Sequence, residues 1–191
     1  MGSDDDARPP LIVLYDANVL YPFQLRNLFV QLGVEYLVLP RWTEAIHDEW
    51  IRNLAEDGRV ARDRLLRTRA LMQRALPEAT VSGFEHRIES LTLPDPDDRH
   101  ILAAAIEARA EAIVTFNLKH FPSGSLACFG ITARHPDEFM CSLLAEDPEA
   151  VLAVLNAARQ NLTTTAPDAR SFIGILDRQG LHRFAAEIRA L

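Results

Sequence analysis

Hydrophobic residues follow two different patterns along this chain. Short, mainly apolar runs occupy residues 11–15, 36–39, 112–116 and 126–132, and Gly130 interrupts the last of them. Runs of this length predict strands that are buried on both faces. Elsewhere apolar residues recur at spacings of three and four, which predicts amphipathic helices. Because the two patterns alternate, the chain is expected to form an α/β fold in which helices cover both faces of a parallel sheet.

Residues that start or stop helices set the expected boundaries. Gly33 is expected to end a helix, and Pro40 is expected to end the second apolar run. Thr43 is a suitable N-cap, because its hydroxyl can accept a hydrogen bond from the first helical turn. The helices expected before the third apolar run cover residues 22–33, 44–56, 59–76, 83–91 and 95–110.

The pattern becomes entirely helical at about residue 135. The expected helices cover residues 136–144, 148–161, 166–178 and 181–191, and a capping box at Thr165 and Asp168 opens the third of them. We therefore expect an α/β domain over residues 11–134 and a helical extension over residues 135–191. Residues 1–10 are polar, acidic and end in two prolines, which predicts a disordered N-terminus.

Composition is that of an ordinary globular protein. The 191 residues are 48% hydrophobic, which suffices for one domain with an appendage. No apolar run reaches the roughly 18 residues of a membrane span, and no signal-peptide segment is visible, so a cytoplasmic location away from membranes is expected. Cys128 and Cys141 are too few for a disulfide scaffold or a zinc site, and buried free thiols are expected.

Charge is distributed unevenly along the chain. The net charge of −7 argues against nonspecific nucleic-acid binding by the surface as a whole. Six arginines nevertheless lie within residues 59–74. Because guanidinium groups bind phosphate through two parallel hydrogen bonds, Arg62, Arg67 and Arg69 are candidates for phosphate contacts. A solvated helix face is the alternative.

Polar residues stand where the first and third apolar runs end. Asp16 follows one run and Asn117 the other. The carboxyl ends of parallel strands share one edge of the sheet, and ligands bind there, so these side chains are expected to converge. Asp16 alone would also suit a helix cap. Glu49 lies on or beside the apolar side of its helix, where a carboxylate needs a partner or a cation.

A second group of acids opens the helix at residues 95–110. This group consists of Asp95, Asp97 and Asp98, which is a larger number of acids than helix capping requires. Asp95 and Asp98 share one face of the expected helix. Oxygen ligands without a His or Cys partner favour Mg²⁺ or Mn²⁺ over zinc. Asp16, Glu49, Asp98 and Asp95 are therefore candidate metal ligands. Such a site suits phosphodiester hydrolysis, because the metal activates water and neutralises charge in the transition state.

Four short motifs occur in order along the α/β part. They are Asp16-Ala17-Asn18-Val19-Leu20, Glu49-Trp50, Asp98-x-x-Ile101-x-Ala103 and Thr115-x-Asn117-x-x-x-Phe121-Pro122. In this order they resemble the PIN domains, and specifically the VapC-type toxin ribonucleases of type II toxin–antitoxin systems. The resemblance covers residues 11–132 and implies a three-layer α/β/α fold with a central parallel sheet.

The resemblance also implies an activity. It implies an endoribonuclease that uses Mg²⁺ or Mn²⁺ to hydrolyse RNA, is held inactive by a cognate antitoxin protein and often forms a homodimer. The catalytic residues would be Asp16, Glu49, Asp98 and Asn117. Two neighbours would support them: Asn18 would position water or a ligand, and Thr115 would orient the first aspartate.

The amide at residue 117 is a departure from the resemblance. The family's fourth acid falls on Asn117, and an amide brings no charge, so a single metal or a weaker second site is expected. Asp95 or Asp97 would then supply the missing charge. A non-catalytic RNA-binding or scaffold module remains an alternative. A haloacid-dehalogenase-like phosphatase is another, although Asn18 stands where its second acid is required. The role of residues 135–191 stays open between packing, dimerisation, antitoxin binding and substrate choice.

Overall fold

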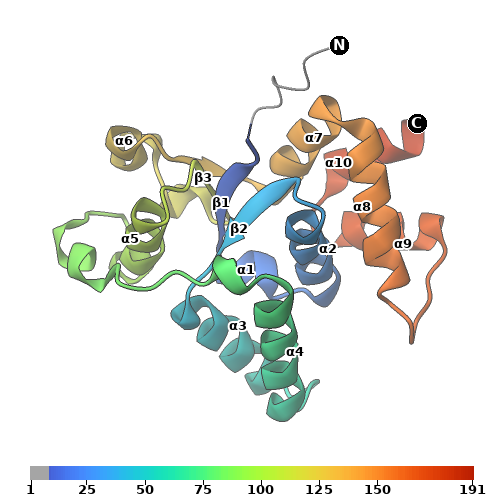
Figure 1. Ribbon diagram of the computed structural model, residues 1–191, viewed down its shortest axis with the longest axis horizontal. Helices are drawn as coiled ribbons and strands as arrows, with labels where there is room; N and C mark the ends of the chain where they lie inside the picture. The colour runs from blue at the N-terminus through green and yellow to red at the C-terminus, as the bar shows by residue number, and fades with distance from the viewer. Residues whose placement is uncertain (1–8) are drawn as a thin grey trace, which may run out of the picture.

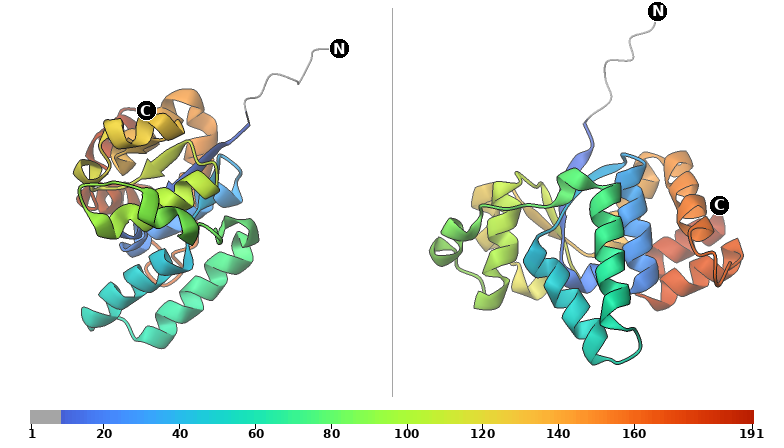
Figure 2. Two further views of the ribbon diagram at one scale, coloured as in Figure 1. Left: turned by 90° about the vertical axis from the view of Figure 1, so that its left-hand side faces the viewer. Right: turned by 60° about the horizontal axis from the view of Figure 1, so that its bottom comes forward.

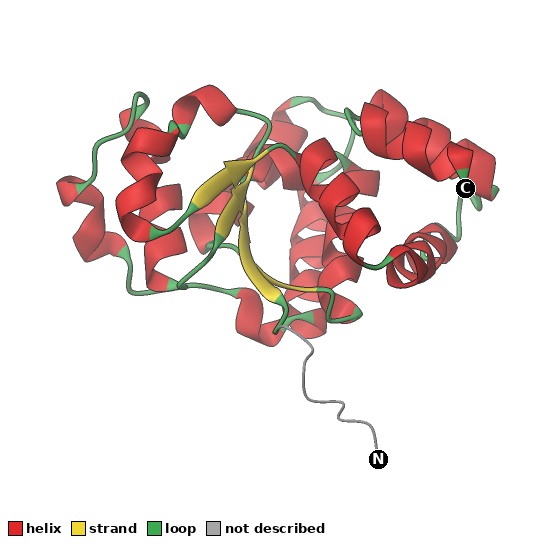
Figure 3. Ribbon diagram, turned by 90° about the horizontal axis from the view of Figure 1, so that it is seen from above, coloured by secondary structure: helices red, strands yellow, loops and turns green. Residues whose placement is uncertain are grey.

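A four-stranded parallel sheet lies at the centre of the chain, in the order β2-β1-β3-β4. The structure is a computed structural model that describes residues 9–191. Except for Pro9 and Pro10, the N-terminus that was expected to be disordered lies outside the described residues. Helices lie on both faces of the sheet (Figures 1 and 3), which confirms the three-layer α/β/α prediction.

The strands explain how polar residues come to share one edge. They are β1 (Leu11–Tyr15), β2 (Val38–Arg41), β3 (Ala112–Val114) and β4 (Thr132–Arg134). β1 lies between β2 and β3 and is parallel to both. β2 is an edge strand that contains Pro40, so the expectation that this proline ends the strand is wrong. An edge strand tolerates proline because the missing N–H can face away from the sheet.

The helices of the α/β part surround this sheet. They are α1 (Ala17–Leu20), α2 (Phe23–Val34), α3 (Glu44–Glu56), α4 (Arg62–Ala75), α5 (Arg99–Glu107) and α6 (Ser123–Leu126). α2 packs against β2, and α5 packs against β1 and β3. α3 and α4 pack against each other and project from the sheet as a pair (Figure 2). The arginine-rich helix α4 begins three residues later than the pattern predicted.

Short 3-10 helices connect these elements. They are η1 (Pro77–Ala79), η2 (Glu85–Ser90), η3 (Pro96–Asp98), η4 (Leu118–His120) and η5 (Ala127–Phe129). The helix expected over residues 95–110 is therefore a 3-10 turn followed by α5, and the segment at 83–91 is also a 3-10 helix. Two of these short helices, η3 and η4, carry residues of the site described below.

Two helix boundaries show what local sequence decides and what packing decides. Thr43 caps α3 as predicted, since its Oγ1 accepts a hydrogen bond from the backbone N–H of Ile46 at 3.1 Å. Gly33 does not end α2 but lies inside it. A Cβ atom at this position would lie 2.6 Å from Cγ of Pro40. The glycine therefore allows α2 to approach the edge strand closely.

The strand expected over residues 126–132 is wrong in extent. These residues form the end of α6, then η5, and only the first residue of β4. Gly130 follows η5 with a φ of +69°, a conformation that favours glycine. A short apolar run cannot by itself distinguish a buried helical turn from a strand, and here both occur within one run.

Four helices form the C-terminal extension, as the sequence predicted. They are α7 (Pro136–Glu146), α8 (Pro148–Gln160), α9 (Ala169–Arg178) and α10 (His182–Ala190). The extension packs beside α2 (Figure 1). The ring of Phe139 in α7 stacks on Phe29 in α2 with 6.3 Å between centroids, and the side chain of Asn27 donates to the carbonyl of Ala158 at 2.6 Å. One hydrophobic core therefore runs through both parts.

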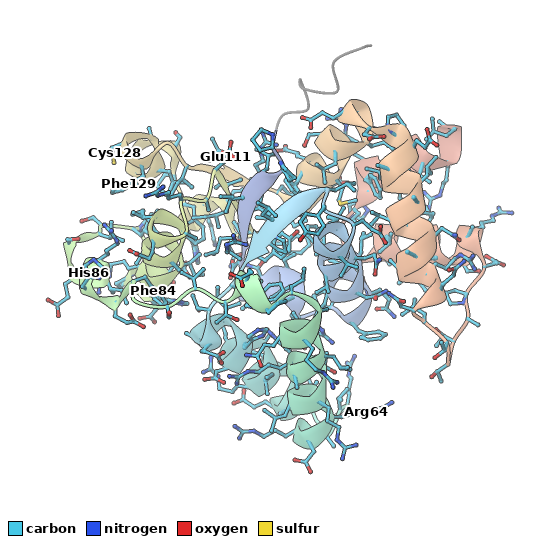
Figure 4. All side chains as sticks on the ribbon, in the orientation of Figure 1. Arg64, Phe84, His86, Glu111, Cys128 and Phe129 are labelled. Atoms are coloured by element: carbon cyan, nitrogen blue, oxygen red, sulfur yellow. The ribbon has the colours of Figure 1, made fainter. Side chains whose placement is uncertain are left out.

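Two smaller predictions about this half need correction. Asp168 itself caps α9, since its Oδ1 accepts the N–H of Ser171 at 2.7 Å, so Thr165 is not the N-cap. Cys141 is buried as expected, but Cys128 is exposed on η5 (Figure 4). Over residues 9–191, no helix combines the length and the apolar character needed to cross a bilayer.

Candidate active site

Asp16 lies directly after the inner strand β1, and its backbone is still held by the sheet. Its N–H donates to the carbonyl of Val114 at 3.1 Å. Its side chain is buried, with 4% of the residue exposed. Its side chain makes no capping hydrogen bond to α1, although the nearby N–H groups of Ala17 and Asn18 lower its pKa. Helix capping therefore does not account for a buried carboxylate here, which needs polar partners or a cation.

Two polar side chains hold the carboxylate of Asp16. Oγ1 of Thr115 and Nδ2 of Asn18 both donate to its Oδ2, each at 2.6 Å. The amide Oδ1 of Asn18 in turn accepts the backbone N–H of Phe116 at 3.1 Å. This network joins the end of β1 to the segment that follows β3. It fixes the orientation of Asp16 by contacts between residues almost a hundred positions apart in sequence.

Glu49 of α3 and Asp98 of η3 share the electrostatic environment of Asp16. Burial raises the pKa of Asp16, and the negative charge of Asp98 raises it further, whereas the Thr115 hydrogen bond lowers it. Burial also raises the pKa of Glu49, to which Asp16 and Asp98 add by repulsion. The structure therefore brings together three of the acids that the sequence proposed, from three different elements.

His120 of η4 contacts the acids of η3, which the sequence analysis did not foresee. Its Nδ1 lies 2.6 Å from Oδ2 of Asp98 and 3.8 Å from Oδ2 of Asp95. One ligand atom from each of these three residues lies within 4.8 Å of the others. The sequence analysis expected oxygen ligands without a histidine partner, and His120 is an additional candidate beside them. The available signal was that His120 follows Asn117 by three residues, one turn of a 3-10 helix.

The remaining predicted site residues are Asp95, Asp97 and Asn117. Asp95 caps η3, because its Oδ1 accepts the N–H of Asp97 at 3.0 Å, and its other oxygen faces His120. Asp97 is exposed. Asn117 donates its backbone N–H to Oγ1 of Thr115 at 2.9 Å. Its exposed side chain forms no hydrogen bond with any part of the chain that the structure describes, so its role as a ligand stays a prediction.

The three candidate RNA-binding arginines of α4 have different surroundings. Arg69 forms ion pairs with Glu44 and Asp48 of α3, the second at 3.3 Å between Nη1 and Oδ1. Arg62 and Arg67 are exposed, as is Arg64, which points outward from α4 in Figure 4. The charge of Arg69 is thus already compensated within the α3–α4 pair.

Comparison with known proteins gives matches to both parts of the chain. A family model described as "PIN domain" matches residues 13–119, more than half of the chain, and one described as "VapC50 C-terminal domain" matches residues 136–190. A protein of Mycobacterium tuberculosis (strain ATCC 25618 / H37Rv) named "Putative ribonuclease VapC50" is 42% identical over 94 residues, which are 49% of this chain and 55% of that protein. The match thus spans about half the length of this relative. No solved structure matches the chain.

Proposed function

Because the chain belongs to the PIN domain family, we propose that it is a divalent-metal-dependent endoribonuclease, the toxin of a toxin–antitoxin pair. The observation that carries this proposal is the convergence of Asp16, Glu49 and Asp98 at the carboxyl edge of the parallel sheet. Two of these carboxyl groups have pKa values raised by burial and by mutual repulsion. Such perturbed acids in a cluster are typical of functional sites.

The donor set fits a hard divalent cation. Carboxylate oxygens are the ligands that Mg²⁺ and Mn²⁺ prefer. The acids of the cluster repel one another and are partly withdrawn from water, so their ionised forms are costly without a cation. Asp16, Glu49 and Asp98 would hold the ion, whereas Asp95, the other predicted ligand, faces His120. The identity of the ion, Mg²⁺ or Mn²⁺, is part of the proposal.

The chain's own residues have separate tasks in this chemistry. A bound divalent cation would activate water and neutralise charge on the phosphate. Thr115 and Asn18 hold Asp16 in one orientation before substrate arrives, which avoids reorganisation during the reaction. Glu49 adds a carboxylate from α3 to the two aspartates, so its charge would help to hold the ion.

The substrate and the partners are inferred from the relatives. The name of the mycobacterial relative supports RNA as the substrate, and the similarity to VapC-type proteins supports a cognate antitoxin, a homodimer and a cytoplasmic location. On α4, Arg62 and Arg67 are the proposed phosphate contacts, and Arg69 is proposed to contribute mainly through its ion pairs. We also propose that residues 11–134 form the catalytic domain and that residues 135–191 form a family-specific extension that shares its core.

One observation favours a second candidate function, a non-catalytic PIN module that binds RNA or a protein. It is the exposed Asn117, which stands where the resemblance implies an acid. A phosphatase of the haloacid-dehalogenase type has less support, because Asn18 donates a hydrogen bond to Asp16 where such an enzyme needs an acid.

Cleavage of RNA by the purified full-length protein tests the proposal. The protein is treated with EDTA, and cleavage of fluorescent single-stranded RNA and of total RNA is measured with and without added Mg²⁺ or Mn²⁺. We expect cleavage only with metal, loss of cleavage in Asp98→Asn, and retention in Asp97→Asn, an exposed acid one residue away. If the protein binds metal and RNA without cleaving any RNA, the non-catalytic module is correct.

A further inference from the structure

The contact between η3 and η4 is a feature that the proposed chemistry does not use. His120 comes from the segment that leaves β3, whereas Asp95 and Asp98 come from the turn that precedes α5, so only the tertiary fold brings them together. The side chains of His120 and Asp98 are 24% and 22% exposed, so both are shielded yet remain reachable from solvent. Nδ1 of His120 points at a carboxylate oxygen of each acid.

The distances among these three groups suit the ligands of one small cation. Two ligand atoms that each lie roughly 2.1 Å from a metal are about 3 Å apart when they are adjacent in its coordination shell. The observed separations from Nδ1 are 2.6 Å to Asp98 and 3.8 Å to Asp95. These values lie on either side of that spacing, so small side-chain rotations would bring all three atoms onto one ion.

The geometry points to a second cation site, formed by Asp95, Asp98 and His120, next to the site formed by Asp16, Glu49 and Asp98. Asp98 has two carboxylate oxygens and would serve both sites. The second site takes the place of the one that an acid at residue 117 would have completed. This inference rests on the proposed function only for the first site, because the second is defined by its own three residues.

The nitrogen ligand determines which ion the second site prefers. Mg²⁺ binds oxygen almost exclusively, whereas imidazole is a good ligand for first-row transition metals. The second site is therefore selective for Mn²⁺ over Mg²⁺, while the oxygen-lined first site accepts either ion. Metal-free protein should bind two Mn²⁺ ions but only one Mg²⁺ ion.

Metal titration of the full-length protein tests the number of sites. Bound Mn²⁺ is counted from the electron paramagnetic resonance signal of the free ion, and bound Mg²⁺ is measured by calorimetry. We expect the second Mn²⁺ to bind at least about tenfold more weakly in His120→Ala and Asp95→Asn. Asp97→Asn removes the same charge from the same turn and should still bind two ions. Circular dichroism checks that each variant is folded.

The spectrum of bound Mn²⁺ separates a metal ligand from a hydrogen-bond partner. Electron spin echo modulation from an imidazole nitrogen is expected in the wild type, and it should be absent in His120→Ala and in His120→Gln, which offers an oxygen instead. Modulation that is missing in the wild type or persists in both variants would overturn the inference, leaving His120 as a residue that only positions Asp98. RNA cleavage without the nitrogen signal would reject the second site alone, and the signal without cleavage would reject the nuclease alone.

Discussion

The two sides of the acidic site hold the same functional group in contrasting ways. Asp16 follows an inner strand, is nearly fully buried and receives two hydrogen bonds on one oxygen. Asp98 ends a 3-10 turn, is 22% exposed at its side chain and contacts a histidine from a distant segment. The first carboxylate is positioned by the sheet itself. The position of the second carboxylate depends on the side chains of neighbouring turns.

This contrast separates what the fold determines from what single residues can change. The strand side of the site consists of Asp16 and its partners at the ends of β1 and β3. Here the position of Asp16 follows from the pairing of β1 with β3, and the hydrogen bond from Thr115 restricts the orientation of its carboxylate. The turn side of the site consists of η3 and η4. Here exchange of one residue in η4 would change the metal ligands without disturbing the sheet. We therefore expect both carboxylates to be needed for cleavage, and the residues of the turns around Asp98 to determine which ions the site takes.

The largest expected effect is that of Asp16→Asn. The substitution keeps the shape of the side chain and an acceptor for Thr115, but it removes the charge that is proposed to hold the metal. RNA cleavage should be abolished, and any growth arrest on expression should be relieved. Because burial raises the pKa of Asp16, the metal-free variant should also melt at a higher temperature than the wild type, as measured by calorimetry.

Asp98→Asn is the matched comparison for this prediction. It should also abolish cleavage, but it removes the 2.6 Å contact of an acid with His120 at a side chain that is 22% exposed, so no gain in melting temperature is expected. If Asp16→Asn still cleaves RNA, or if both variants gain equally in stability, the contrast between the two sides is incorrect.

A smaller effect is expected for Thr115→Val, which tests how the strand side is held. Valine has nearly the same shape but cannot donate to Asp16 or accept the N–H of Asn117. Since groups that support a metal ligand typically contribute 10–100-fold, affinity for Mg²⁺ should fall by about that factor in calorimetry. Thr115→Ser keeps the hydroxyl and should bind almost normally. Equal affinities in the two variants would mean that the hydroxyl does not orient Asp16.

A still smaller effect is expected from charge on α4, which lies outside both sides of the site. Reversal of Arg62 and Arg67 to Glu should weaken RNA binding severalfold and reduce the slope of log affinity against log salt by about two. Metal affinity should not change. The same double reversal at Arg170 and Arg178 of α9 is the control, and an equal effect there would mean that only net charge matters.

The strand side of the site was also the more predictable from sequence. An apolar run followed by an acid places Asp16 at the edge of a parallel sheet, since the chain direction and the strand pattern are enough to locate it. His120 was missed because its contact with Asp98 joins residues 22 positions apart. It depends on a short 3-10 turn that leaves no periodic pattern in the sequence.

The errors in the fold have a related physical cause. Gly33 and Pro40 were interpreted as stop signals because local propensity assigns them that role. In the structure they lie against each other, and the glycine makes room for the proline of the edge strand. Close packing between elements therefore overrode local preference, and a single sequence carries no direct sign of which residues will meet.

The smallest effect expected is a pH dependence that reports the strand side alone. Asp16 has a pKa above its ordinary value in the folded protein, so its ionisation destabilises the metal-free fold. Below the ordinary carboxyl pKa of about 4, wild type and Asp16→Asn should have similar melting temperatures, because both side chains are neutral. As the pH rises through the raised pKa, the wild type should lose stability relative to the variant, and the difference should then level off.

Added Mg²⁺ should reverse the sign of this difference in melting temperature, because only the wild type gains a bound cation. A difference that stays constant across this pH range would show that the carboxylate of Asp16 is not destabilised by burial, and the contrast between the two sides would lose its electrostatic basis.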